Sequence, residues 1–262
     1  MSFRILLICF TAFSILACYA RKEACLDLLS ANYDVTADDD CVSCCIYPTL
    51  KLTISHMAGD SIFRTSAIYS NNFNQNYIIE DIRYYVSDFN VFQGNTNYKI
   101  REKIETENNV ISVANDMKIL RAADKTLDIG TIRASGLFDS LQLKVGLTND
   151  MTKNTFVNLP SSHVLLKNNM LKDTAGTIAH FAMRYKKVSS NDSIPKTIIL
   201  TSLPALPVIS VDKSTTTKKG ETINFAIKAE YLRLLKNVDL NLPEAQIIMK
   251  VKENIVEMLT VK

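Results

Sequence analysis

Residues 79–92 read IEDIRYYVSDFNVF and form the clearest strand pattern in the chain. Ile82, Tyr84 and Val86 lie at every second position, and the alternation resumes at Val91 after slipping by one register near Asp88. A period of two directs one row of side chains into a core and the other row toward water. The stretch therefore predicts a long β-strand with an irregularity near Asp88.

Short runs of the same kind, divided by polar turns, fill residues 49–240. They read TLKLTIS, VISV, TLDIGTI, SLQLKVGL, TIAHFAMRYKKV, TIILTSL, PVISV and TINFAIKAEYLRLL. Few helical patterns occur between them. Many short strands in sequence predict a mainly β fold, specifically an antiparallel two-sheet β-sandwich.

The last segment, residues 243–262, reads PEAQIIMKVKENIVEMLTVK and has a different period. Its apolar residues recur at spacings of three and four: Ile247, Ile248, Val251, Ile255, Met258 and Leu259. This spacing predicts an amphipathic C-terminal α-helix that starts near Pro243, because proline and glutamate suit a first helical turn. We expect the helix to pack on the sandwich and to close a sheet edge.

The first eighteen residues predict export. A basic start at Arg4 precedes an apolar run from Ile5 to Ile15, which is shorter than the roughly 20 residues of a spanning helix. Ala17-Cys18 then follows, and the segment resembles a bacterial lipoprotein signal, in which that cysteine is lipid-modified. We therefore expect a signal peptide over residues 1–17, a lipid anchor at Cys18 and a tether over 18–24, with the protein held on a bacterial membrane outside the cytoplasm.

Composition and motifs exclude several classes of function. The chain is 47% hydrophobic and 22% charged, with a formal net charge of +3 that is spread along the sequence. Nucleic acid is therefore not an expected partner. No Gly-x-Ser-x-Gly, phosphate-binding glycine loop or His-Glu-x-x-His motif occurs, and the three histidines show no nucleophile–base spacing. We expect a protein without catalytic activity.

Residues 25–48 form a short acidic segment that contains Cys25, Cys41, Cys44 and Cys45. In an oxidising compartment these cysteines predict two disulfides, with three connectivities to choose from, although adjacent Cys44 and Cys45 cannot bond to each other without strain. A zinc site that uses the Cys41-x-x-Cys44 spacing with Cys25 or Cys45 is the alternative. A redox motif is less favoured because no βαβ pattern surrounds it.

The acidic side chains of the same segment offer hard oxygen donors for calcium. These residues are Asp27, Asn32, Asp34, Asp38, Asp39 and Asp40. No EF-hand glycine and closing glutamate accompany them, so a solvated acidic loop held by disulfides is the favoured interpretation.

Two resemblances to known families follow from these residues. The segment from Cys25, with Ala31-Asn32-Tyr33-Asp34 and Ser43-Cys44, resembles a small module of secreted Bacteroidetes-type proteins. Residues of roughly 45–262 resemble the MbnP-like copper-binding domain family, which defines a domain over 49–262. The residues that carry this second resemblance read LTISHMAGD, IEDIRYYVSDFNV, LQLKVGLTND, PSSHVLLKNNM and KENIVEML.

The resemblances imply a β-sandwich outside the cytoplasm that binds copper. They imply His56 and His163 as the leading metal ligands and Met170 and Met57 as thioether donors. His180 is a further candidate, in an alternating run that also suits a packed strand residue. The small module implies a Cys25–Cys44 disulfide, which leaves Cys41 to pair with Cys45.

The chain also departs from the copper-binding family. It reads Met170-Leu171-Lys172 where members carry a Tyr-Trp pair, and it contains no tryptophan. Two hypotheses therefore follow for its function. The first is a lipid-anchored protein that captures copper or hands it to a partner protein. The second is a binding or adhesion module on the same sandwich, with the copper site lost.

Overall fold

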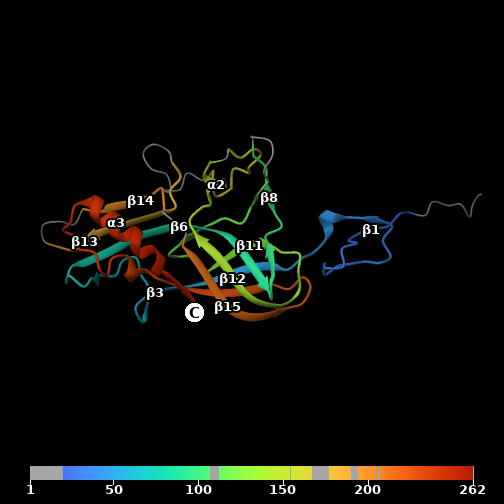
Figure 1. Cartoon of the computed structure of the whole chain (residues 1–262), viewed down its shortest axis with the longest axis horizontal. Helices are drawn as coiled ribbons and strands as arrows, with labels where there is room; N and C mark the ends of the chain where they lie inside the picture. The colour runs from blue at the N-terminus through green and yellow to red at the C-terminus, as the bar shows by residue number, and fades with distance from the viewer. Residues whose placement is uncertain are drawn as a thin grey trace, which may run out of the picture. The chain divides into compact units, whose positions relative to one another are not determined.

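The computed structural model describes residues 20–106, 112–153, 155–166, 177–189, 194–203, 205 and 207–261 (Figure 1). The chain divides into two compact units, Met1–Tyr47 and Pro48–Lys262. No helix within the described ranges has both the length and the apolar character needed to cross a membrane.

The larger sheet of the second unit has eight strands, and β6 (Asn76–Gln93) runs through its centre (Figure 1). Strand β13 pairs with the first half of β6 and β12 with the second half, while β10 and β7 pair along the opposite edge. The other seven strands are β5 (Tyr69–Ser70), β7 (Thr96–Lys99), β10 (Lys118–Arg121), β12 (Gly136–Val145), β13 (Phe181–Lys187), β14 (Lys196–Leu200) and β15 (Val208–Thr217).

The second sheet has five strands in the order β11-β3-β16-β17, with β4 paired to β3. Its strands are β3 (Thr49–Ala58), β4 (Ser61–Ile62), β11 (Thr126–Thr131), β16 (Ile223–Glu230) and β17 (Leu259–Val261). Strands β3 and β16 pair in parallel, which the long connection between them permits. The predicted mainly β sandwich with antiparallel sheets and a C-terminal helix is confirmed, and this parallel pair is an addition to it.

The helix predicted from Pro243 is shorter than its apolar pattern indicates. Helix α3 spans Glu244–Asn254 with Pro243 at its N-cap, and a 3-10 turn, η3 (Ile255–Glu257), follows it. Leu259 then enters β17, which pairs with β16 and extends the edge of the second sheet. The period of three to four ends there because hydrogen bonds to β16 replace helical ones.

The remaining elements are short. In the second unit they are β8 (Lys103–Ile104), β9 (Val113–Ala114), α2 (Asn149–Lys153) and η2 (Tyr231–Leu234). In the first unit, β1 (Glu23–Ala24) pairs with β2 (Asp39–Asp40), and η1 (Val42–Cys44) follows.

Two clusters of buried side chains cover the two faces of β6. Ile82, Tyr84 and Val86 belong to the main core, together with residues of the second sheet such as Leu52 and Phe225. Tyr85 points to the other face, as alternation requires, and belongs to a smaller cluster. That cluster is completed by Ile104, Val113, Met117, Leu147, Met151, Leu165, Ala179 and Ala182. Two of the three histidines, His163 and His180, lie next to this cluster in the chain.

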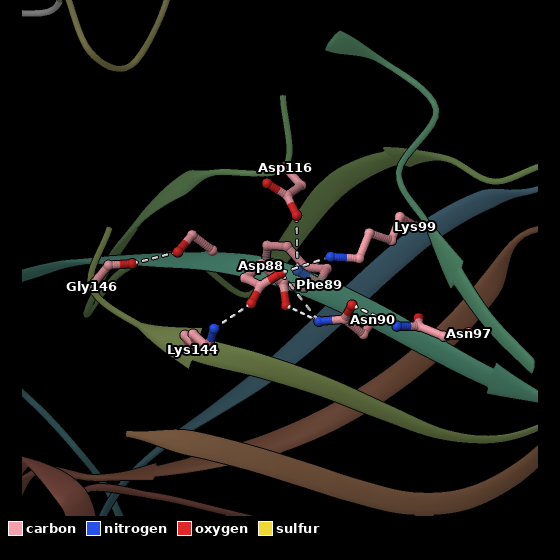
Figure 2. A network of polar contacts seen from close by, with 9 residues as sticks. Asp88, Phe89, Asn90, Asn97, Lys99, Asp116, Lys144 and Gly146 are labelled. Carbon is pink, nitrogen blue, oxygen red and sulfur yellow. Dashed lines mark hydrogen bonds and ion pairs between the residues drawn. The ribbon is translucent and has the colours of Figure 1, made fainter. Parts of the chain in front are cut away.

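The register slip predicted near Asp88 is a β-bulge in β6. Asp88 has φ of 54°, and Leu143 alone lies opposite Asp88 and Phe89, because Gln142 pairs with Asn90 and Lys144 with Ser87. Aspartate is one of the few residues that adopt this left-handed conformation at modest cost. The bulge turns the Phe89 N–H away from the ladder, and Asp116 Oδ2 accepts its hydrogen bond at 3.0 Å (Figure 2).

Charged groups surround the bulge on both sides. Lys144 Nζ lies 2.5 Å from Asp88 Oδ2, and Lys99 Nζ lies 3.5 Å from Asp88 Oδ1 (Figure 2). Burial acts to raise the pKa of Asp88, but the lysines outweigh it and the pKa is lowered. Asp116 has no such partner among the described residues, and its Oδ1 is buried without a hydrogen bond. Burial and the Asp88 charge raise the pKa of Asp116 to about 6.

The raised pKa of Asp116 predicts a loss of stability with rising pH. The folded pKa of about 6 exceeds the ordinary value of 3.8, so the folded state binds the proton more tightly than the unfolded chain. The stabilisation that protonated Asp116 contributes is complete below pH 4 and is lost as pH rises through 6. Asp116→Asn should remove this dependence, which is worth on the order of 2–3 kcal/mol.

Urea unfolding of the wild type and Asp116→Asn at pH values from 4 to 7.5 measures this effect. As pH rises, the unfolding free energy of Asp116→Asn should increase relative to that of the wild type. Asp60→Asn, at an exposed position, is the matched control and should keep the wild-type slope. Equal slopes in the wild type and Asp116→Asn would contradict the assignment, whatever constant offset the substitution causes.

Candidate functional site

His56 lies on β3, is buried, and has a hydrogen-bond partner at each ring nitrogen. Its Nε2 contacts the backbone carbonyl of Asp124, and its Nδ1 lies 2.8 Å from the Tyr231 hydroxyl. A carbonyl only accepts hydrogen bonds, so Nε2 carries the proton and Nδ1 accepts from Tyr231. Burial lowers the pKa of His56 more than the Asp124 carbonyl raises it, which favours the neutral imidazole.

His163 is half-buried in a turn after Pro160, and both of its nitrogens also have partners. Nε2 lies 2.9 Å from Asn115 Oδ1, and Nδ1 accepts the backbone N–H of Leu165 at 3.3 Å. Burial, followed by the charge of Lys118, lowers the pKa of this imidazole. Within the described ranges, no hydrogen bond joins His163 to His56.

His180 precedes β13 directly and is buried, with a relative exposure of 8%. Its Nδ1 accepts the backbone N–H of Leu147 at 3.0 Å. Its own N–H bonds the Leu200 carbonyl and its carbonyl accepts the N–H of Tyr85, so the backbone holds the ring in place. Burial, then Lys252, lowers the pKa of His180, and the neutral ring carries its proton on Nε2.

The three imidazoles therefore share one property. A neutral imidazole has a single nitrogen lone pair, and a metal ion binds through that lone pair. In His56, His163 and His180 it is occupied by a hydroxyl or backbone N–H donor. In the described chain, no group of three or more His, Cys, Asp or Glu residues is placed to hold a metal ion.

The methionines do not complete a site with His56 in the described chain. Strand β3 runs without a break through Ala58, so Met57 and His56 point to opposite faces of the sheet. The bend at Gly59 comes too late to bring them together. Met170 lies outside the described residues.

A cleft of about 600 Å³ lies beside His180 and opens between the ends of β12, β13 and β14. Its described lining is rich in hydroxyl groups and contains no carboxylate: Lys144, Leu147, Thr148, Asn149, Thr152, Thr177, Ile178, His180, Thr201, Ser202, Leu203 and Ala205. Lys252 of α3 reaches its edge, where Nζ lies 3.4 Å from Ser202 Oγ. The sequence did not indicate this cleft, because its lining residues are dispersed over three segments and form no motif.

In the acidic segment, the carboxylates bind groups of their own unit. Asp34 pairs with Lys22 at 2.5 Å, and Asp39 pairs with Arg21 at 2.6 Å. Asp38 and Asp40 accept backbone N–H groups of Lys22 and Leu26. Asp27 accepts the N–H of Leu29 and contacts the Tyr47 hydroxyl, and the Asn32 side chain bonds the backbone on both sides of Cys45. These contacts within the unit engage the side chains that the sequence offered as calcium ligands.

The cysteines require a correction. A cross-link is confirmed, but it joins Cys25 to Cys45, with Cα atoms 5.0 Å apart, and not Cys25 to Cys44. Cys41 and Cys44 are free, so the expected second disulfide is absent. The reason is the 3-10 turn η1, which directs the Cys44 side chain outward, while Cys45 follows in an extended conformation that faces buried Cys25.

Comparison with known protein families and with curated proteins finds no match. Among solved structures, MbnP from Methylosinus trichosporium is similar, with a TM-score of 0.47 and 11% sequence identity. The match covers 73% of this chain and 78% of that chain. A likeness at this level is a distant similarity of fold, and the candidate site is defined by this chain's own side chains.

Proposed function

We propose that this chain is an exported binding protein without catalytic activity, and that the cleft beside His180 holds its ligand. The observation that carries the proposal is the chemistry of the cleft wall. The described lining offers hydroxyl, amide and ammonium groups but no carboxylate. A few polar groups that converge in a concave site are the usual basis of small-ligand recognition.

The charges at the cleft favour an anionic ligand. Lys144 is already paired with Asp88, so it contributes hydrogen bonds more than net charge. Lys252 bonds the Ser202 hydroxyl and has no carboxylate partner among the described residues, and its charge reaches His180. The Nε2–H of neutral His180 adds a further donor. A small carboxylate or oxyanion therefore matches the cleft better than a cation does.

The same hydrogen bonds argue against histidine-bound copper and against base catalysis. Because the Leu147 N–H occupies the lone pair on Nδ1, His180 can donate a hydrogen bond but cannot accept a proton there. A copper ion at His56 or His163 would have to break the bond to Tyr231 or Leu165. Of the two hypotheses for function, the non-metal binding module is therefore better supported.

Sulfate and succinate are suitable probes, because both are fully charged at neutral pH. Isothermal titration of the purified chain should detect binding of at least one of them. Lys252→Ala should weaken that binding about tenfold, the equivalent of 1.4 kcal/mol, because it removes the surplus charge at the cleft. Lys250→Ala is the matched control on the same helix, where Lys250 pairs with Glu253. Failure of both probes, or equal losses in the two variants, would contradict the proposed site.

The neutral state of His180 predicts how binding depends on pH. Burial and the charge of Lys252 lower the pKa of His180 below its ordinary value of 6.5, so the imidazole is neutral in this range. Sulfate affinity should therefore remain constant within about twofold between pH 6.5 and 8. An affinity that falls steeply over that range would show that a protonated imidazole is required, which contradicts the assignment.

Export and lipid anchoring are proposed from residues 1–18, which lie outside the described part of the chain. The disulfide Cys25–Cys45 supports an oxidising compartment. In a bacterial host, Cys18→Ala should move the protein from the membrane fraction to the soluble fraction and abolish labelling by a fatty-acid analogue. Retention of the label in the variant would contradict modification at Cys18.

A further inference from the structure

We propose that Cys41 and Cys44 are an exchangeable dithiol–disulfide pair in the Met1–Tyr47 unit, and that its reaction partners are thiols and disulfides of other molecules. The pair is independent of the cleft beside His180 and needs no ligand there. It also differs from the pairing with Cys45 that the small module implies for Cys41.

A single backbone turn brings the two cysteines together. Cys41 precedes η1 and Cys44 ends it, and the backbone N–H of Cys44 bonds the Cys41 carbonyl at 3.1 Å. A turn closed by such a bond holds its first and fourth Cα atoms within about 7 Å of each other. Disulfides bridge Cα atoms that are about 4.4–6.8 Å apart. A bond between these two residues therefore needs little movement of the backbone.

The two side chains also lie on the same side of the turn. The Cys44 Sγ lies 3.0 Å from the Cys41 carbonyl oxygen, so this side chain is folded back toward Cys41. The Cys44 thiol also hydrogen-bonds the Cys41 sulfur, which is the main reason that the pKa of Cys41 is lowered. Cys44 is exposed and Cys41 is partly exposed, so an external thiol or disulfide can reach the pair from solvent.

The turn is held at both ends by the rest of the unit. The backbone N–H of Cys41 bonds the Ala24 carbonyl at 2.9 Å, and Asn32 Nδ2 bonds the Cys44 carbonyl at 2.8 Å. Each thiol is therefore kept close to the other before any reaction. Groups held in this way react with each other far faster than with a molecule from solution, which favours closure of the pair over a lasting bond to an external thiol.

Exposure separates this pair from the Cys25–Cys45 disulfide. Cys25 is fully buried, which protects its bond to Cys45 from external thiols. Structural disulfides resist reduction by glutathione, whereas exposed ones have higher reduction potentials and are the labile ones. In an oxidising compartment both bonds are closed at rest. A reductant then opens the bond between Cys41 and Cys44 first.

The exchange balances in electrons and protons. The Cys41 thiolate attacks one sulfur of an external disulfide, whose S–S bond breaks and releases one external thiolate. The Cys44 thiol then gives up its proton and attacks the Cys41 sulfur, which expels the second external thiolate. The pair loses two electrons and two protons, and the external disulfide gains them as two thiols. Reduction by external thiols reverses these steps.

The test uses one tryptic peptide, because residues 23–51 contain all four cysteines of the segment and no internal lysine or arginine. The chain, purified without reductant, is equilibrated with glutathione buffers of rising thiol content and alkylated before digestion. The untreated peptide should take up no alkyl group. With rising thiol it should gain two groups, at Cys41 and Cys44. The groups at Cys25 and Cys45 should follow only at a ratio of reduced to oxidised glutathione at least about 100-fold higher.

Two variants complete the test. Cys44→Ser cannot close the pair, so after treatment with oxidised glutathione it should keep a glutathione bound to Cys41 as a mixed disulfide. Ser43→Ala is the matched control, which keeps both thiols and should show the wild-type order of alkylation. An intact bond between Cys25 and Cys45 shows that each variant is folded.

Four outcomes would contradict the pair. The first is free thiols at Cys41 and Cys44 in the untreated chain, and the second is a bond from either of them to Cys25 or Cys45. The third is uptake of all four alkyl groups at the same glutathione ratio. The fourth is a folded Cys44→Ser variant that carries no glutathione.

Discussion

The hydrogen bond from the Phe89 N–H to the buried carboxylate of Asp116 is the constraint on which the larger sheet depends. Strand β6 pairs with β13, β12, β10 and β7, and the bulge at Asp88 and Phe89 separates the segments of β6 that pair with β10 and with β7. A buried backbone N–H without a partner would destabilise this centre by an amount comparable to a lost hydrogen bond. Asp116 supplies the partner; this hydrogen bond lowers the pKa of Asp116, but burial and the Asp88 charge outweigh it and raise the pKa. The bond thereby holds the bulge in the strand that pairs with β5, β7, β10, β12 and β13.

A second general property is that the histidines are structural. His56 and His180 each accept a hydrogen bond through the imidazole lone pair, which fastens β3 to η2 and the start of β13 to Leu147. His163 accepts the N–H of Leu165 within its own turn and donates its Nε2–H to Asn115 Oδ1, which fastens that turn to Asn115. Histidine count and spacing alone do not distinguish such a residue from a metal ligand. The distinction depends on which neighbour faces each ring nitrogen, and that neighbour is 33 residues away for His180 and 175 away for His56.

The fold was predictable from sequence because period-two alternation is a local property. The pattern over residues 79–92 indicated both the central strand and the irregularity at Asp88. The C-terminal helix was predicted at its start, where Pro243 and Glu244 are local signals, and was predicted too long at its end, where pairing with β16 decides the structure. The disulfide partner of Cys25 was predicted wrongly because it depends on the direction in which η1 turns the chain. The cleft was not predictable, because residues from three segments meet there only in the folded protein.

The parallel pairing of β3 with β16 has a consequence for how the protein reaches its native state. Thr49–Ala58 and Ile223–Glu230 are adjacent strands of one sheet, although more than 160 residues separate them, and Leu259–Val261 then pairs with β16. The second sheet therefore cannot assemble until nearly the whole chain has been synthesised. Long-range pairing of this kind slows folding. If the chain is exported as proposed, the late pairing of β3 with β16 means that the second sheet closes only after translocation.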